Sequence, residues 1–339
     1  MNVGDVIDAA FFCDEVGPVS ERVSDLVRAE ARAAESEGID EAVLQAKSEQ
    51  WRGERELITA EETEAWLILR GLTLDDFSNH FFRHAALEKE ALQSKSSEVE
   101  APETDLDLRE LLRIELLLSG EFDALALRHS WRFAARQAAT TEPPLHLVEA
   151  ERTRFQQRAG FPAWLGTRAH DRLWLEEMAA LEAGYRSQAE SLLSAEARAR
   201  MLTTQHLPLT RVQLELLEVE SLDAAREAFL CVREDGIPLA EIAADGRYSL
   251  RHLDAFYEDL PEDLQRSVLC ATAGEVLEPI PHADGYQLWR LRQKQEPDLA
   301  DSAVRERVDQ RIQERHFSEL ATTCIRWMMP CGTPYVAAI

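Results

Sequence analysis

The sequence lacks any apolar run long enough to cross a bilayer, and its opening lacks the features of a secretory signal. The segment MNVGDVIDAAFFCDEVG has no basic residue, no long apolar core and no small-residue cleavage site. No later stretch approaches the roughly 20 apolar residues that a membrane helix needs. We therefore expect a cytoplasmic protein without a membrane span.

Cysteine is scarce and scattered. The chain has five cysteines, an odd number, and none of them forms a C-x-x-C pair. Such a set does not describe a disulfide framework or a common zinc motif, so reduced thiols in the cytoplasm are expected. The cysteines are Cys13, Cys231, Cys270, Cys324 and Cys331.

Basic residues are in the minority. The 37 Lys and Arg residues stand against 63 Asp and Glu residues, which gives a formal net charge of −26. Nucleic-acid phosphates need basic partners, so this excess of acidic residues argues against a nucleic-acid ligand. It also disfavours binding to anionic membrane surfaces. Much of the charge serves solubility, and the remainder favours basic or neutral polypeptide ligands.

The common loops for nucleotides and nucleophiles are also missing. There is no G-x-G-x-x-G, no P-loop and no G-x-S-x-G, so no cofactor is expected. His80 and His84 stand one helical turn apart in HFFRH, but the Glu of the zinc-protease motif is absent and no third ligand is evident. We expect two partly buried histidines beside phenylalanines, and no metal.

Helices dominate the part of the chain before residue 206. The full chain of 339 residues, 45% of them apolar, is long enough for two or three domains. Apolar positions at helical spacing predict a first helical module over 1–95 and a second helical segment over 105–205. The polar, aperiodic stretch 96–104 predicts a linker. In the second segment, helices are expected from Leu106 to about Thr140, before Pro143-Pro144.

Two helix starts can be located within the first module. Thr59 with Glu62 predicts a capping box, and Thr73 with Asp76 repeats the pattern more weakly. Gly71 between them is a natural helix end. The first helix carries Trp66, Leu67 and Leu69, and the second is expected to turn four apolar residues inward: Leu74, Phe77, Phe81 and Leu92.

The end of the chain predicts one long amphipathic helix and a tail. Within the segment 295–328, a helix from Leu299 to Met328 carries an apolar stripe that must be covered, and the N-terminal helices are the expected cover. Residues 329–339 have no helical period. The stripe comprises Val304, Val308, Ile312, Phe317, Leu320, Cys324 and Trp327.

Residues 206–294 alone have mixed architecture. An alternating run over 212–216 predicts a strand, LDAAREAFLCVREDG predicts a helix, and Asp284-Gly285 between alternating segments predicts a hairpin. This order resembles the parvulin (rotamase) domain of peptidyl-prolyl isomerases. Its moderately specific markers are Ala224-Ala225, Gly274-Glu275, Pro279 and Asp284-Gly285-Tyr286.

Most of the chain resembles the SurA/PpiC class of chaperone-isomerases. The block ITAEETEAWLILRGLTLDDF is similar to a helical motif of that class. The resemblance implies an α+β protein with a mostly helical N-terminal module and a small parvulin-like β/α domain. It also implies a long C-terminal helix that packs back on the helical module.

The resemblance implies which positions would form the family's site. At most of these positions this chain has a different type of residue from the family. The histidine of the last strand falls on Gln287, beside Tyr286. The histidine of the first strand falls on Leu216, or on Glu215 if the register slips by one. The family's Gly-Gly-Asp-Leu-Gly loop is replaced by AADGRYSLRHLDAFYEDL.

The family's Met and Phe, which line the proline-ring pocket, fall on Leu260 and Leu264. A leucine-lined cleft without polar groups favours peptide binding with little or no isomerase turnover. Burying one aliphatic group there would contribute roughly 1.5–3 kcal/mol. The other interpretation is that Leu216, Leu260 and Leu264 are ordinary core residues.

The composition and the resemblance together predict a cytoplasmic chaperone or escort of the SurA/PpiC type that binds extended polypeptide, with basic or proline-containing sequences favoured. The resemblance further implies a precursor peptide in a maturation or export system as the client, and a modifying enzyme or exporter as a further partner. One alternative is an active isomerase in which Gln287, Glu215 and Tyr286 supply a polar edge. Another is a scaffold subunit for a modifying enzyme or transporter.

Overall fold

The computed structural model describes residues 2–34, 39–92, 108–158, 171–244, 246, 248–283 and 285–325. The described chain divides into two units. The helical unit contains the residues up to 190 and those from 316 on, and the sheet unit contains residues 191–315. The predicted linker 96–104 and tail 329–339 lie outside the described residues.

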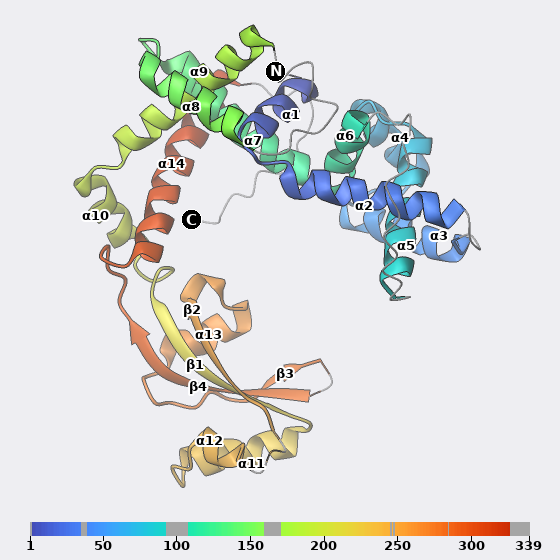
Figure 1. The fold of residues 1–339 in the computed structure, drawn as a ribbon. Helices are drawn as coiled ribbons and strands as arrows, with labels where there is room; N and C mark the ends of the chain where they lie inside the picture. Colours follow the sequence, from blue (N-terminus) through green and yellow to red (C-terminus); the bar gives the residue numbers. More distant parts are fainter. Residues whose placement is uncertain are drawn as a thin grey trace. The chain divides into compact units, whose positions relative to one another are not determined.

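The described part of the helical unit is built from helices, labelled in Figure 1. None of the described helices combines the length and apolar character that crossing a bilayer requires. The helices are α1 (Val3–Phe12), α2 (Gly17–Ala34), α3 (Glu41–Glu54), α4 (Ala60–Leu69), α5 (Leu74–Leu92), α6 (Leu108–Ser119), α7 (Glu121–Ala138), α8 (Leu145–Gln157) and α9 (Arg172–Leu192).

The predicted helix starts are confirmed. The Thr59 side chain accepts a hydrogen bond from the Glu62 backbone, and the Glu62 carboxylate accepts one from the Thr59 backbone, so α4 begins with a full capping box. Thr73 and Asp76 exchange the same pair of bonds at the start of α5. Gly71 between the two helices has φ +65°, a conformation that glycine adopts without strain.

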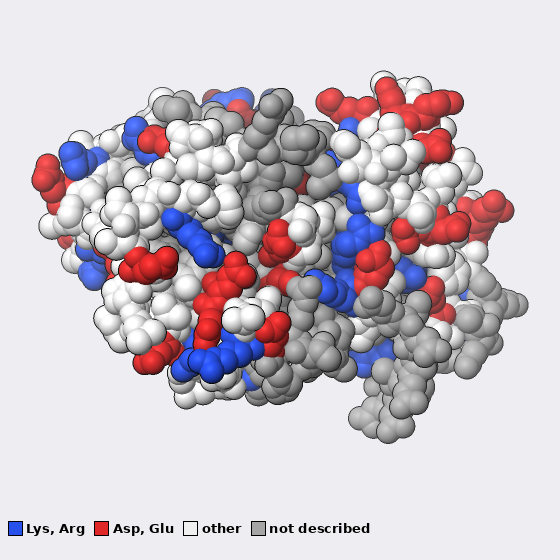
Figure 2. Space-filling model, turned by 90° about the horizontal axis from the view of Figure 1, so that it is seen from above, with Lys and Arg blue, Asp and Glu red and all other residues white. Residues whose placement is uncertain are grey.

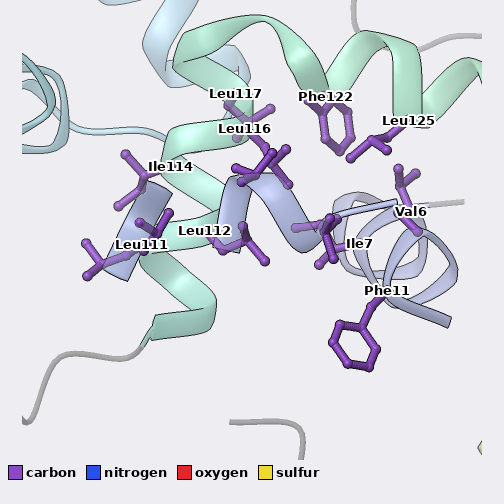
Figure 3. Packing of buried hydrophobic residues seen from close by; sticks show 14 of the residues in the cluster. Val6, Ile7, Phe11, Leu111, Leu112, Ile114, Leu116, Leu117, Phe122 and Leu125 are labelled. Carbon is purple, nitrogen blue, oxygen red and sulfur yellow. The ribbon is translucent and has the colours of Figure 1, made fainter. Parts of the chain in front are cut away.

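The core of the helical unit is assembled from α1, α2, α6 and α7 with aromatic side chains from α3 and α5. Figure 3 shows side chains of α1, α6 and α7 that belong to one buried cluster, with Val6 next to Leu125. The second half of α1, up to Phe12, is buried throughout. A helix that is covered on all sides belongs inside a domain, as α1 does here.

The helices expected between Leu106 and Thr140 are α6 and α7. They are separated at Gly120, which has φ +85°. A residue in this left-handed conformation ends one helix and lets the chain change direction before the next, and glycine adopts it without strain. The periodicity of the sequence does not reveal this break.

One expectation about α5 is wrong in part. Phe77 and Phe81 are buried as expected, but Leu74 is 56% exposed and Leu92 is 86% exposed. Both leucines were assigned to the inner face. They lie on the first and last turns of the helix, where α5 extends past the core.

Within the described residues, the sheet unit contains four antiparallel strands in the order β2-β1-β4-β3. Figure 1 shows the strands crossing between α13 and the pair α11 and α12. Together with the helical unit, this sheet confirms the α+β class. The elements are α10 (Ala195–Thr204), β1 (Arg211–Val219), α11 (Leu222–Arg233), α12 (Leu239–Ile242), β2 (Leu250–Phe256), α13 (Glu262–Cys270), β3 (Ile280–His282), β4 (Gly285–Gln295) and α14 (Ser302–Cys324).

The predicted hairpin joins β3 to β4. His282 pairs with Gly285, and Ala283 adopts φ 44°, while Asp284 lies outside the described residues. A side-chain carbon on Gly285 would lie 2.5 Å from the backbone oxygen of Val219. The glycine therefore allows β4 to start against the end of β1.

Helix α14 supplies apolar residues to both units. Val304 and Val308 are buried with Leu209 and Phe256 in the sheet unit, whereas the ring of Phe317 lies 4.7 Å from that of Tyr185 in the helical unit. The sequence predicted cover by the N-terminal helices. That is wrong for the first half of the stripe, which residues of α10 and β2 cover.

Candidate functional site

The central strand β1 has two covered faces. Leu214 and Leu216 pack with residues of α13 on one side, here called the α13 face of the sheet. Leu217 and Val219 pack with residues of α11 on the other, the α11 face. Because side chains alternate along a strand, the predicted site residues can be assigned to one face or the other from the strand register.

The three predicted pocket leucines lie together on the α13 face. Leu216, Leu260 and Leu264 are 7%, 4% and 2% exposed and belong to one cluster with Trp289 and Val268. Their side chains fill the space between sheet and helix with one another. In this conformation they are core residues, and a peptide contact by them stays a prediction that would require α13 to move.

Gln287 shares this face but does not lie opposite Leu216. Leu216 pairs with Trp289, and Gln287 pairs with Glu218 on β1 and Ile280 on β3. The Gln287 side chain is half-buried at the end of the sheet, next to the apolar cluster rather than across a groove. It offers an amide at a partly open position.

Tyr286 and Glu215 lie on the α11 face. Tyr286 pairs with Val219 and packs beside the α11 cluster. Glu215 pairs with His252 on one side and Arg290 on the other. The predicted polar edge of Gln287, Glu215 and Tyr286 is therefore divided between two faces, and the register does not bring the three groups together.

Glu215 is a buried carboxylate surrounded by basic side chains. Its oxygens lie 3.7 Å from Arg290, 3.5 Å from Arg292 and 3.9 Å from His252. Arg290 also donates to the backbone oxygen of Gly274. A buried acid needs such partners to offset its lost hydration, so these basic groups stabilise Glu215 within the sheet.

A hollow of about 700 Å³ lies in the helical unit beside the stacked rings of Phe12 and Phe155. Its charged lining includes pairs formed within the chain. Arg186 lies 2.6 Å from Glu182, and Arg154 lies 2.7 Å from Glu151. A peptide that entered the hollow would have to compete with these pairs, which disfavours it as a binding site.

Apolar side chains are exposed at the turn between α4 and α5. Ile68 is 67% exposed, Leu69 is 47% exposed and Leu74 is 56% exposed. We call these three residues the α4–α5 patch. Leu67 is buried at 1% exposure and Trp66 packs against the core beside Trp51, so α4 turns these two residues inward and leaves Ile68 and Leu69 outside.

Acidic residues accompany the α4–α5 patch. Glu61 and Glu64 on α4 and Asp75 on α5 are exposed. The face drawn in Figure 2 carries acidic side chains in several groups, consistent with the net charge of −26. Carboxylates beside an apolar surface favour a partner that has both apolar and basic groups.

The sequence reasoning missed the α4–α5 patch. The sequence predicts Trp66, Leu67 and Leu69 on one helix, but it does not show which of them the core covers. The signal was present, because the four consecutive apolar residues 66–69 span more than one turn of a helix and cannot all face one side.

Comparison with solved structures finds similarities to foldases and chaperones. The peptidylprolyl isomerase PrsA from Bacillus cereus is 10% identical, with a TM-score of 0.37, and the match covers 63% of this chain and 88% of that chain. The foldase protein PrsA from Streptococcus pneumoniae is 14% identical, with a TM-score of 0.28 and coverages of 70% and 97%. A SurA-like chaperone from Campylobacter jejuni is 10% identical, with a TM-score of 0.21 and coverages of 62% and 82%.

These names agree with the resemblance seen in the sequence. Comparison with family models finds no match, and comparison with curated proteins finds none either. Because the identities and TM-scores are low, the function has to rest on the contacts of this chain itself.

Proposed function

We propose that the protein is a chaperone-type binder of extended polypeptide, which it holds at the α4–α5 patch of its helical unit. The observation that carries the proposal is the exposure of Ile68, Leu69 and Leu74 around one turn. Apolar side chains gathered on a surface mark interaction sites more often than single exposed ones do. A short apolar segment of a client would cover them.

The expected affinity is weak. Full burial of one aliphatic side chain contributes roughly 1.5–3 kcal/mol, and association costs about 4–15 kcal/mol of lost freedom. Three such side chains therefore support transient binding, which suits a protein that must release its client. The exposed acids Glu61, Glu64 and Asp75 add attraction for basic clients and make binding weaker at high salt.

In this proposal the sheet unit is a structural module without isomerase turnover. Its α13 face is filled by Leu216, Leu260, Leu264 and Trp289, and Gln287 stands at the edge of that face. Acceleration of proline isomerisation needs polar groups that stabilise the twisted amide. Since the register separates Gln287 from Glu215, the binding function is the better supported of the two.

The finer aspects of the function are part of the same proposal. A precursor peptide in a maturation or export system is the proposed client, and a modifying enzyme or exporter is the proposed partner that receives it. The cytoplasm is the proposed location, and the described cysteines support it because Cys13, Cys231, Cys270 and Cys324 are free thiols.

The test is fluorescence anisotropy with a labelled, unstructured peptide that alternates apolar and basic residues. The full-length protein is expected to bind it with saturation, and Ile68→Asp with Leu69→Asp is expected to weaken binding at least about tenfold because a charge replaces buried apolar surface. The matched control is Leu230→Asp, at a residue of α11 that is 52% exposed. Equal binding by parent and double variant would overturn the proposed site.

A scaffold role predicts a different result. Under that alternative the protein binds one stoichiometric protein partner and has no affinity for loose peptides. Absence of saturable peptide binding by the parent protein would therefore reject the chaperone proposal.

A further inference from the structure

His80 and His84 are joined by a third potential ligand from another helix. The two histidines are one turn apart on α5, so both imidazoles lie on the same side of the helix. Glu115 of α6 lies between them, with an oxygen 2.9 Å from His80 Nδ1 and an oxygen 3.1 Å from His84 Nε2. Glu115 follows His84 by 31 residues in the chain, which is why the sequence showed no third ligand.

One oxygen of Glu115 lies at nearly equal distances from both histidines. Oε2 lies 2.9 Å from His80 Nδ1 and 3.2 Å from His84 Nε2. Ligand atoms around a tetrahedral zinc ion are about 3.3 Å apart, given metal–ligand distances near 2.0–2.1 Å. The two oxygen–nitrogen distances are thus close to an edge of such a tetrahedron, and the two nitrogens lie within 4.8 Å of each other, so a bound ion would draw the histidines together.

The other oxygen of Glu115 is held by an arginine. Arg22 Nε of α2 lies 3.0 Å from Oε1, and the same guanidinium also pairs with Glu121 of α7. This contact fixes the orientation of the Glu115 carboxylate, as residues behind a metal ligand commonly do. Oε2 then faces His80, while His84 Nε2 lies at similar distances from both oxygens, 3.1 Å from Oε1 and 3.2 Å from Oε2.

The charge around the cluster is compatible with a cation. Glu115 and Glu121 carry two negative charges, and Arg22 carries one positive charge between them. Arg83, a further cation on α5, is paired with Glu30 at 2.8 Å. With neutral imidazoles, the group of Glu115, Glu121 and Arg22 is therefore negative by one charge.

Access to the cluster is greatest beside His84. The side chains of His80 and Glu115 are 8% and 5% exposed, whereas that of His84 is 29% exposed. An ion could enter beside His84 and keep a water molecule in its fourth position. The ligand atoms of the three residues all lie within 4.8 Å of one another, so one ion could contact all of them.

We propose that His80, His84 and Glu115 form a binding site for a divalent transition metal of the zinc class. Two imidazoles and one carboxylate suit zinc, cobalt or nickel better than magnesium or calcium, which prefer oxygen ligands alone. The ion would tie α5 to α6 and stabilise the helical unit. This site is independent of peptide binding at the α4–α5 patch.

The experiment uses the full-length protein after treatment with a chelator that is then removed. Isothermal titration with Zn²⁺ is expected to show one equivalent bound, with an increase in Tm. Addition of Co²⁺ is expected to give visible absorption bands of a tetrahedral nitrogen and oxygen site. No saturable Zn²⁺ uptake and no Co²⁺ absorption would show that the cluster is only a hydrogen-bonded network, and would overturn the proposal.

A substitution locates the ion. His84→Gln is expected to lower Zn²⁺ affinity at least about tenfold and to abolish the Co²⁺ bands, since one of three ligands is lost. His146→Gln, at an exposed histidine of α8, is expected to bind as the parent does. Unchanged Zn²⁺ and Co²⁺ binding by His84→Gln would place the ion elsewhere. The Co²⁺ spectrum of the parent protein is decisive if a variant fails to fold.

Discussion

Leu216 of β1 lies directly opposite Trp289 of β4, and both side chains are buried beneath α13. A cross-strand pair of an aliphatic and an aromatic residue stabilises a sheet through close contact on one face. Leu264 of α13 completes this cluster at 2% exposure. The pair therefore belongs to the structural core of the sheet unit.

The first prediction concerns that core. Leu264→Ala is expected to lower the free energy of unfolding by about 2–5 kcal/mol, because it removes buried methyl groups and leaves a cavity. Urea unfolding followed by tryptophan fluorescence measures the change. Leu269→Ala, at a residue of the same helix that is 49% exposed, is the control and should change stability by no more than about 0.5 kcal/mol. Similar losses for both variants would contradict the packing described.

The second prediction concerns catalysis. The protein is expected not to accelerate cis–trans isomerisation of a short proline peptide in a protease-coupled assay, because the predicted polar edge does not converge with Leu260 and Leu264. Gln287→Ala is expected to behave as the parent does. Clear acceleration by the parent that is lost in Gln287→Ala would instead establish an isomerase with an altered site.

The third prediction concerns acid stability. Burial, followed by the charge of Arg132, lowers the pKa of His129 to about 4, while Asp5 and Glu15 oppose the shift. The unfolded chain takes up a proton near the ordinary His pKa of about 6.5, and the folded chain does not until about pH 4. The free energy of unfolding is therefore unaffected by His129 above about pH 6.5. It falls by on the order of 2–3 kcal/mol as the pH is lowered toward 4, because the unfolded chain binds the proton first.

His129→Asn removes this titration and is expected to flatten the loss of Tm between pH 6.5 and 4. The comparison is the same substitution at an exposed histidine of α8, His146→Asn. A profile of His129→Asn that falls as steeply as the parent's would assign the acid sensitivity to other groups.

The fourth prediction concerns the hairpin. Gly285→Ala is expected to destabilise the sheet unit by roughly 1–3 kcal/mol, because the new methyl group would overlap the backbone oxygen of Val219 and force β4 to shift. Gly53→Ala, in the last turn of α3 with open space around it, is expected to stabilise by about 0.5–1 kcal/mol. Thermal unfolding distinguishes the two, and a neutral Gly285→Ala would mean that β4 can start differently.

Local signals in the sequence predicted local structure well. The capping residues Thr59 and Thr73 and the glycine Gly71 act within a few residues of themselves, and all three behave as expected. The alternating run of β1 likewise predicted a strand, since side-chain alternation depends on the backbone alone. The break at Gly120 was not located, because an isolated glycine in an apolar periodic stretch is compatible with a continuous helix.

The candidate site could be predicted only in part. The family resemblance brought Leu216, Leu260 and Leu264 into one group, and in the structure the three belong to one buried cluster. It could not determine that α13 covers them, nor that Gln287 is displaced by two residues from the position opposite Leu216. Both depend on strand register and helix packing, which involve residues distant in the chain.

By itself, the sequence determined the helical character of the first two hundred residues, the helix starts near Thr59 and Thr73, and the strand–helix–hairpin order of the sheet unit. Only the tertiary structure decided that Glu115 meets His80 and His84, and that the stripe of α14 is shared, with Val308 buried in one unit and Phe317 in the other. The physical reason is that helix capping and side-chain alternation act between near neighbours, whereas strand register, burial and ion pairing depend on which distant segments the fold brings into contact.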